Sequence, residues 1–177
     1  MKKVMLLTIF AALMMISSAA VAQTTASGTL TVTATVNGSI QLVFNSNASG
    51  LALSSGAGTN TATLAFGNVS AFGVISAGIV RSTTVTNFTV SSAVDVLVSE
   101  TNSASANYTL KAQLGSADAV NNWAVGGVAV TSAAQSTLTA TGAYGSNSNF
   151  PVAITVPFTT ASGTNISNTI NYTATAN

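Results

Sequence analysis

Polar and apolar residues alternate along most of the chain with the period of two that is typical of half-buried β-strands. The clearest case is residues 27–36, where Leu30, Val32, Ala34 and Val36 would face one side and threonines the other. The same reasoning predicts strands over 40–44, 61–66, 80–90, 93–99, 107–114, 123–130, 136–140, 152–158 and 166–174. The stretches between them are rich in Gly, Asn and Ser, which favour turns and loops.

This succession of short strands predicts an all-β fold, an immunoglobulin-like antiparallel β-sandwich of about eight strands. Residues 45–60 are expected to form a loop or a weak hairpin. Intrinsic disorder is the competing interpretation, but disordered chains combine low hydrophobicity with high net charge. This chain is 47% hydrophobic and 4% charged, so we expect it to fold.

The first 22 residues have the layout of a cleavable secretory signal peptide. A basic start with Lys2 and Lys3 precedes residues 4–16, which are apolar apart from Thr8, and Ala20-Val21-Ala22 fits a cleavage site. We therefore predict a signal peptide over 1–22 and a single β-sandwich domain over 23–177. A retained N-terminal anchor is the alternative, although about 13 apolar residues fall short of the roughly 20 that span a bilayer.

Charge is nearly absent, with four basic and three acidic residues in the whole chain. After loss of the leader only Arg81 and Lys111 remain against Asp95, Glu100 and Asp118. A chain with so few basic groups cannot neutralise phosphates, which excludes an electrostatic nucleic-acid binder. Little charge repulsion keeps copies apart, so the composition favours self-association.

The residues that usually carry catalysis are scarce. The chain has no His and no Cys, which excludes imidazole, thiol and disulfide chemistry. Asp95 and Glu100 have opposite parity in one predicted strand, so they would face opposite sides and could not form a catalytic carboxylate pair. Asp118 lies in turn-like sequence, and with Asn121 and Asn122 it could offer oxygen ligands to calcium, although such sites usually need more carboxylate. We expect no enzyme activity, no cofactor and no metal.

Trp123 is the only tryptophan of the chain. A lone aromatic residue in an alternating stretch is more often a core residue than a platform for stacking sugars. If Trp123 instead stacks on a sugar, the alternative function follows. The protein would then be a self-contained secreted module that binds carbohydrate or surface glycan through Trp123.

Three segments carry a resemblance to a known family. LTVTATVNGSIQL (residues 30–42) resembles the mature N-terminus of chaperone–usher pilins, particularly the colonisation-factor type, and of spore-coat-U-like secreted domains. LAFGNVS (residues 64–70) is similar to the Phe-Gly segment that ends a strand in such domains, and YTATAN (residues 172–177) resembles their C-terminal strand. Together these segments cover about 26 of the 155 residues that follow the leader.

The resemblance implies an immunoglobulin-like sandwich that lacks its last strand, which the N-terminal extension of another subunit supplies. Carried over to this chain, residues 24–36 would contain the donor strand, with Leu30, Val32, Ala34 and Val36 as candidate subunit contacts. The implied function is a structural subunit of a fimbria-like or coat-like assembly, exported to the periplasm or surface of a bacterium. Its partners would be further copies, a periplasmic chaperone and an outer-membrane assembly protein. Completion of the fold by the same strand within one chain is the rival arrangement.

Overall fold

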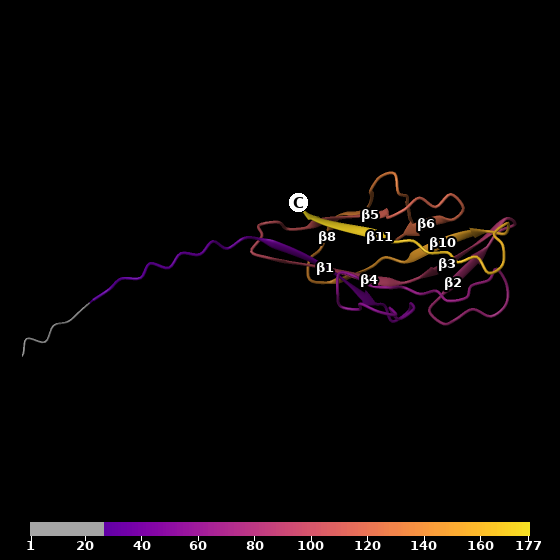
Figure 1. Cartoon of the computed structure of the whole chain (residues 1–177), viewed down its shortest axis with the longest axis horizontal. Coiled ribbons are helices and arrows are strands. Elements are labelled where there is room, and N and C mark those ends of the chain that lie inside the picture. The colour runs from indigo at the N-terminus through magenta and orange to yellow at the C-terminus, as the bar shows by residue number, and fades with distance from the viewer. Residues whose placement is uncertain (1–26) are drawn as a thin grey trace, which may run out of the picture. The chain divides into compact units, whose positions relative to one another are not determined.

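The computed structural model describes residues 27–177, among which it contains strands, turns and loops but no helix. Within this range no helix is long and apolar enough to cross a membrane. Every strand belongs to the compact unit Val36–Asn177, which we call the body (Figure 1). The eleven strands are β1 (Ser39–Ser46), β2 (Val80–Thr83), β3 (Asn87–Ser92), β4 (Val94–Thr101), β5 (Tyr108–Leu114), β6 (Asn122–Val125), β7 (Val128–Val130), β8 (Ser136–Gly142), β9 (Asn147–Asn149), β10 (Val152–Pro157) and β11 (Ile170–Ala176).

The strands form three antiparallel sheets, which confirms the prediction of an all-β antiparallel fold. The largest sheet has the order β2-β3-β10-β6-β7, and two three-stranded sheets have the orders β1-β4-β9 and β11-β5-β8. The predicted signal peptide over 1–22 lies outside the described residues.

Two sheet faces close around a common apolar core. Every second side chain of β3, β4, β5 and β10 is buried, as period-two alternation requires. Val90, Val125 and Ile154 of the five-stranded sheet pack with Val94 and Ala112 of the two smaller sheets. A second cluster, which includes Val96, Val98 and Leu110, fills the space between β4 and β5.

Two predicted strands are hairpins in the structure. The stretch 80–90 divides into β2 and β3, and 123–130 divides into β6 and β7. Gly126 and Gly127 join the second pair with φ angles of 57° and 80°. A two-residue type I′ turn needs positive φ at both central positions, and glycine adopts it without strain. The two hairpins thus divide two of the ten predicted stretches into four strands.

Two other predicted strands are absent from the structure. Residues 61–66 form only an isolated bridge, between Ser55 and Thr63, inside the long irregular segment between β1 and β2. Residues 27–36 form no strand, although their alternation is the most regular of the chain. Leu30, Val32 and Val36 are 88%, 79% and 73% exposed, and Ala34 is also exposed. Alternation indicates which side chains would share one face of a strand. A strand forms, however, only where another strand offers a free edge for backbone hydrogen bonds.

Candidate functional site

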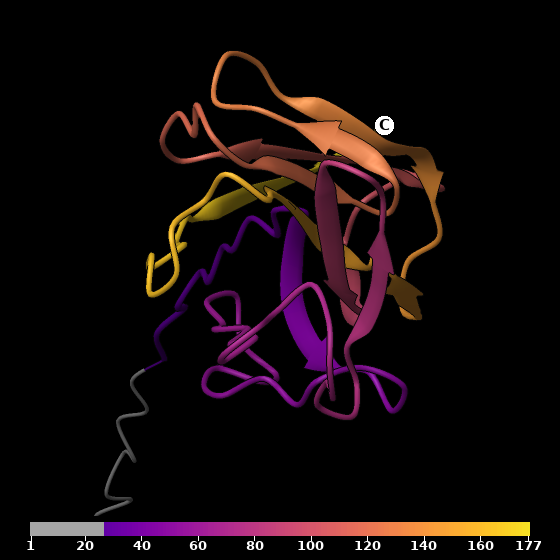
Figure 2. The same ribbon diagram turned by 90° about the vertical axis from the view of Figure 1, so that its right-hand side faces the viewer.

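The body contains an open groove of about 1980 Å³. One wall consists of β1 and residues 58–71 of the segment that follows it, and the other consists of residues 160–172, which lead into β11. In Figure 2 the magenta segment after β1 and the yellow segment before β11 face the same side of the body. Core residues of the five-stranded sheet, including Val90 and Ile154, form the floor. The groove therefore lies directly over the hydrophobic core, whose side chains remain buried beneath it.

Two edge strands flank this groove. Both β1 and β11 stand at the end of a sheet, so each has a full strand neighbour on one side only. Along its free edge β1 makes a single bridge, in which the Phe44 N–H donates to the Thr59 carbonyl oxygen at 2.8 Å. Other backbone groups on these edges are available to a further strand, which is the usual way in which an open edge binds an extended peptide.

The side chains of β1 and β11 on the groove include several apolar ones that are only partly buried. Phe44 and Tyr172 meet edge to face, with ring centroids 5.0 Å apart and planes at 71°. Both residues line the groove, as do Ile40, which is 38% exposed, and Leu42. Burial raises the pKa of the Tyr172 phenol above its ordinary value, so this ring stays neutral and behaves as an apolar surface.

The predicted ligand residue Trp123 lies among the floor residues of the groove. It is only 7% exposed, and its indole Nε1–H donates to Asp118 Oδ2 at 2.8 Å. Its polar atom is already satisfied, so this arrangement is the one that a core tryptophan requires. It does not favour the glycan-binding alternative, which needs an exposed ring face.

Asp118 closes the turn that precedes β6. Its Oδ1 accepts the backbone N–H groups of Val120 and Asn121 at 3.0 and 2.9 Å, and its Oδ2 accepts from Trp123. Burial opposes ionisation, but the hydrogen bonds from Asn121, Trp123 and Val120 outweigh it and lower the pKa to about 2. Both carboxylate oxygens accept hydrogen bonds from residues of this turn or from Trp123, as the sequence predicts for a turn residue. The loop therefore does not present them to a cation.

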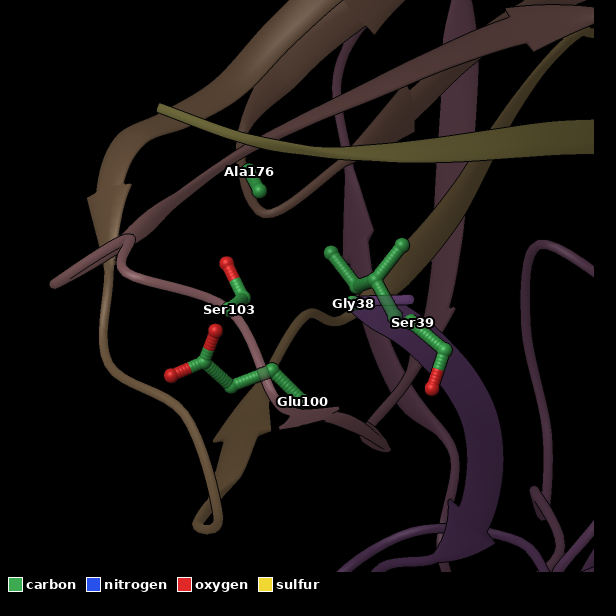
Figure 3. Close-up of a pocket in the computed structure, with 6 residues that line it drawn as sticks. Gly38, Ser39, Glu100, Ser103 and Ala176 are labelled. Carbon is green, nitrogen blue, oxygen red and sulfur yellow. The ribbon is translucent and has the colours of Figure 1, made fainter. Parts of the chain in front are cut away.

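The other two carboxylates lie on opposite faces of β4, as their parity predicts. Asp95 accepts a hydrogen bond from the Asn47 side chain at 2.7 Å. Glu100 points to a separate small pocket of about 170 Å³ at the start of β1, and its buried Oε2 has no hydrogen-bond partner. Figure 3 shows Glu100 and Ser103 on one side of this pocket, across from Gly38 and Ser39. Within residues 27–177 no group of three or more potential metal-ligating side chains occurs.

The groove was not visible in the sequence. Its walls come from segments more than 100 residues apart, β1 and β11, and only the tertiary arrangement brings their free edges to one opening. No protein-family model, no curated protein and no solved structure matches this chain. The groove and the segment 27–36 therefore have to be interpreted from their own chemistry.

Proposed function

We propose that the protein is a non-catalytic structural subunit of an extracellular or cell-surface assembly, built by exchange of β-strands between copies. In this proposal the body is an immunoglobulin-like sandwich that lacks one strand. Residues 27–36 of one copy, at the N-terminus of the exported chain, supply that strand to the groove of the next copy. A periplasmic chaperone and an outer-membrane assembly protein are the partners expected for such export.

The observation that carries the proposal is the groove between two free strand edges. It is lined by both apolar and polar side chains and flanked by β1 and β11, whose open edges an added strand could use. The same chain carries an alternating segment without a strand partner. In this proposal one copy supplies both an open edge beside the groove and an alternating segment that can add to such an edge.

The segment 27–36 matches the groove in chemistry. Ten extended residues span about 33 Å. Leu30, Val32, Ala34 and Val36 form one continuous apolar face, and all four are exposed to water in the described structure. Burying a Val or Leu side chain contributes about 1.5–3 kcal/mol, so seating this face would stabilise the complex by several kcal/mol.

Asn37 and Gly38 link the segment 27–36 to β1. To fold back beside β1, the chain would need a tight hairpin at Asn37-Gly38, and the usual type I′ turn requires positive φ at both residues. Neither has positive φ in the structure. Gly38 also packs closely on the backbone of Asn102, whose carbonyl oxygen would lie 2.9 Å from a Cβ at position 38. A side chain at position 38 would therefore be crowded by this backbone.

The carboxylates support a non-catalytic role. Asp118 is committed to its turn, while Asp95 and Glu100 face opposite sides of β4. These positions leave no pair of acids that face a common substrate. The groove instead offers apolar side chains and backbone edges, which suit recognition of a polypeptide.

The experiment that tests the proposal compares Val32→Asp with Thr31→Asp. We expect unboiled native material of the unmodified protein to give a ladder on an SDS gel, and boiling to collapse it to one band because no cysteine can form covalent links. A charge at position 32 would have to lie against the apolar side chains of the groove and should abolish the ladder. The same charge at position 31 stays on the outer face and should leave the ladder in place.

The proposal would be overturned by a single monomer band in unboiled native protein, or by equal effects of the two variants. A peptide of residues 27–36 provides an independent readout. Added to the chain lacking these residues, it should raise the melting temperature, and its Val32→Asp version should not.

A further inference from the structure

The inward face of β4 ends in a carboxylate. Glu100 follows Val96 and Val98 on this face, at the period of two that carries the strand's buried side chains. Its Oε2 is buried and has no hydrogen-bond partner. A buried carboxylate oxygen without a donor is unfavourable, so a ligand that donates to this oxygen would gain binding free energy.

The carboxylate of Glu100 forms part of the wall of the small pocket at the start of β1. This pocket has a volume of about 170 Å³ and is lined by Gly38, Ser39, Ile40, Glu100, Ser103 and Ala176. Figure 3 shows the Glu100 carboxylate and the Ser103 hydroxyl close to each other on one side of it. A cavity of about 150 Å³ can hold benzene, so this pocket has room for about six non-hydrogen atoms.

The walls of the pocket have one polar and one apolar side. Ile40 of β1 is the direct strand partner of Glu100 in β4, and Ala176 comes from the end of β11. Ile40 and Ala176 present hydrocarbon, whereas Glu100 and Ser103 present oxygen. Gly38 lies across from them without a side chain that would fill the space. The combination suits a ligand with a charged head and a short hydrocarbon body.

The hydroxyl groups beside the carboxylate differ in what they can offer to a ligand. Ser39 Oγ lies 2.7 Å from Thr101 Oγ1, so these two hydroxyls already bind each other. Ser103 Oγ accepts the backbone N–H of Ser105 at 3.1 Å, and a hydroxyl oxygen has a second lone pair. Ser103 can therefore accept one further hydrogen bond next to Glu100.

Both cations of the body are placed away from this carboxylate. The Arg81 guanidinium donates to two backbone carbonyl oxygens of residues 70–73, both at 2.8 Å. Lys111 lies on the outer face of β5, because both of its neighbours in the strand are buried. Residues 27–177 contain no other Lys or Arg. A cation that pairs with Glu100 would therefore have to come from a ligand.

The donor set indicates which kind of cation fits. Calcium takes about six to eight oxygen ligands, usually with several carboxylates, whereas this pocket offers a single carboxylate. A primary ammonium group carries one charge and three N–H donors. Two of these donors would be used by Glu100 and Ser103, and the attached alkyl chain would lie along Ile40 and Ala176, as the stem of a lysine does on an apolar surface.

We propose that the pocket binds a primary alkylammonium ion, with Glu100 and Ser103 as acceptors for its N–H groups. The ligand contacts β1, β4 and β11 of one body, so this inference goes beyond the proposed function and does not depend on strand exchange. A free alkylamine and a lysine side chain of another polypeptide both supply this group. Because the ligand binds the folded body, it should also raise the melting temperature.

Titration with n-butylammonium chloride tests the site. The Val32→Asp chain is used at constant ionic strength, with the backbone amides followed by NMR, because this substitution is expected to keep copies apart and lies at an exposed position. We expect saturable shifts at Gly38 and Ser103, with a Kd on the order of 1 mM for a ligand of this size. The uncharged 1-butanol and n-butyltrimethylammonium, which has no N–H donor, should each bind at least about tenfold more weakly.

Two variants of the pocket and one matched control locate the binding. Glu100→Gln keeps the shape of the side chain but removes its charge, and should raise the Kd about tenfold or more. Ala176→Leu narrows the apolar side and should also raise the Kd. Asp95→Asn removes a carboxylate from the opposite face of the same strand and should leave the Kd unchanged. Melting curves show that each variant is folded, and butylammonium should stabilise Asp95→Asn but not Glu100→Gln.

The outcomes decide both the site and the source of its ligand. Shifts that do not saturate, equal Kd values for the parent and Glu100→Gln, or equal binding of 1-butanol would each overturn the proposal. Nα-acetyl-lysine N-methylamide presents the same ammonium group on a peptide backbone. Tighter binding of this probe than of butylammonium would support the site and assign it to a lysine side chain, and weaker binding would support it and assign it to a free alkylamine. A monomeric native protein would overturn strand exchange and leave this site standing.

Discussion

The interior strands and the groove strands of this body use similar residues but reach different degrees of burial. The strands β4, β5 and β10 each pair on both sides, and their inward side chains are almost completely buried. The strands β1 and β11 pair on one side, and their inward side chains stay half-buried. The comparison teaches that alternation supplies an apolar face, whereas burial of that face requires neighbours on both edges.

The largest effect that would test this comparison comes from truncating one leucine in each region. Leu110 of β5 is fully buried, so Leu110→Ala should lower the free energy of unfolding by about 3 kcal/mol. Leu64 of the groove wall is only partly buried, and Leu64→Ala should cost about 1 kcal/mol. Denaturant unfolding measures both, in the Val32→Asp background that keeps the chain unassembled. Equal losses would show that the groove is as closed as the core.

A smaller effect is expected from filling space in the interior region. Gly142 ends β8, and a Cβ at this position would run into the Tyr108 ring, which is fully buried. Because the ring has no room to move, Gly142→Ala should destabilise the body by about 2 kcal/mol in thermal or denaturant unfolding. Gly28→Ala is the control, since nothing lies within 4 Å of its Cβ. A neutral Gly142→Ala would mean that the core around Tyr108 can relax.

The smallest effect concerns the turn beside the groove floor. The pKa of Asp118 is lowered from 3.8 to about 2, so the ionised form stabilises the folded state above about pH 4. That contribution is lost as the pH falls from about 4 to about 2, because the carboxylate becomes protonated. Asp118→Asn should cost about 1 kcal/mol at pH 7 and flatten the decline of stability over this range.

Urea unfolding at pH 7, 4 and 2 measures that difference, with Trp123 fluorescence as the probe. A variant whose stability falls with acid as steeply as that of the unmodified chain would contradict the assignment. In that case another group would be responsible for the acid sensitivity.

The sequence predicted the interior strands well, for a physical reason. Where a strand has neighbours on both edges, period-two alternation and burial coincide, and the predictions over 93–99, 107–114 and 152–158 correspond closely to β4, β5 and β10. Parity also placed Asp95 and Glu100 on opposite faces of β4, and local turn chemistry identified the role of Asp118.

The predictions that were wrong concern segments whose structure depends on pairing with another strand. Residues 27–36 and 61–66 alternate, but neither forms a strand, since alternation does not reveal whether an edge is available. The hairpin at Gly126-Gly127 was hidden inside one apolar run, although the two adjacent glycines were a usable signal. The groove depends on the approach of β1 and β11, which no local pattern encodes.

The orientation of β1 and β11 has a mechanical consequence. Ile40 and Ala176 line one small pocket while Phe44 packs on Tyr172, so the two strands pass each other in opposite directions along the body. In the proposed assembly, an exchanged segment seated beside these strands would lie along the line that joins successive copies. Tension along that line would act in shear, loading the backbone hydrogen bonds of both edges together rather than peeling them apart one by one. A joint of this kind resists a steady pull without any covalent link, in a chain that has no cysteine to provide one.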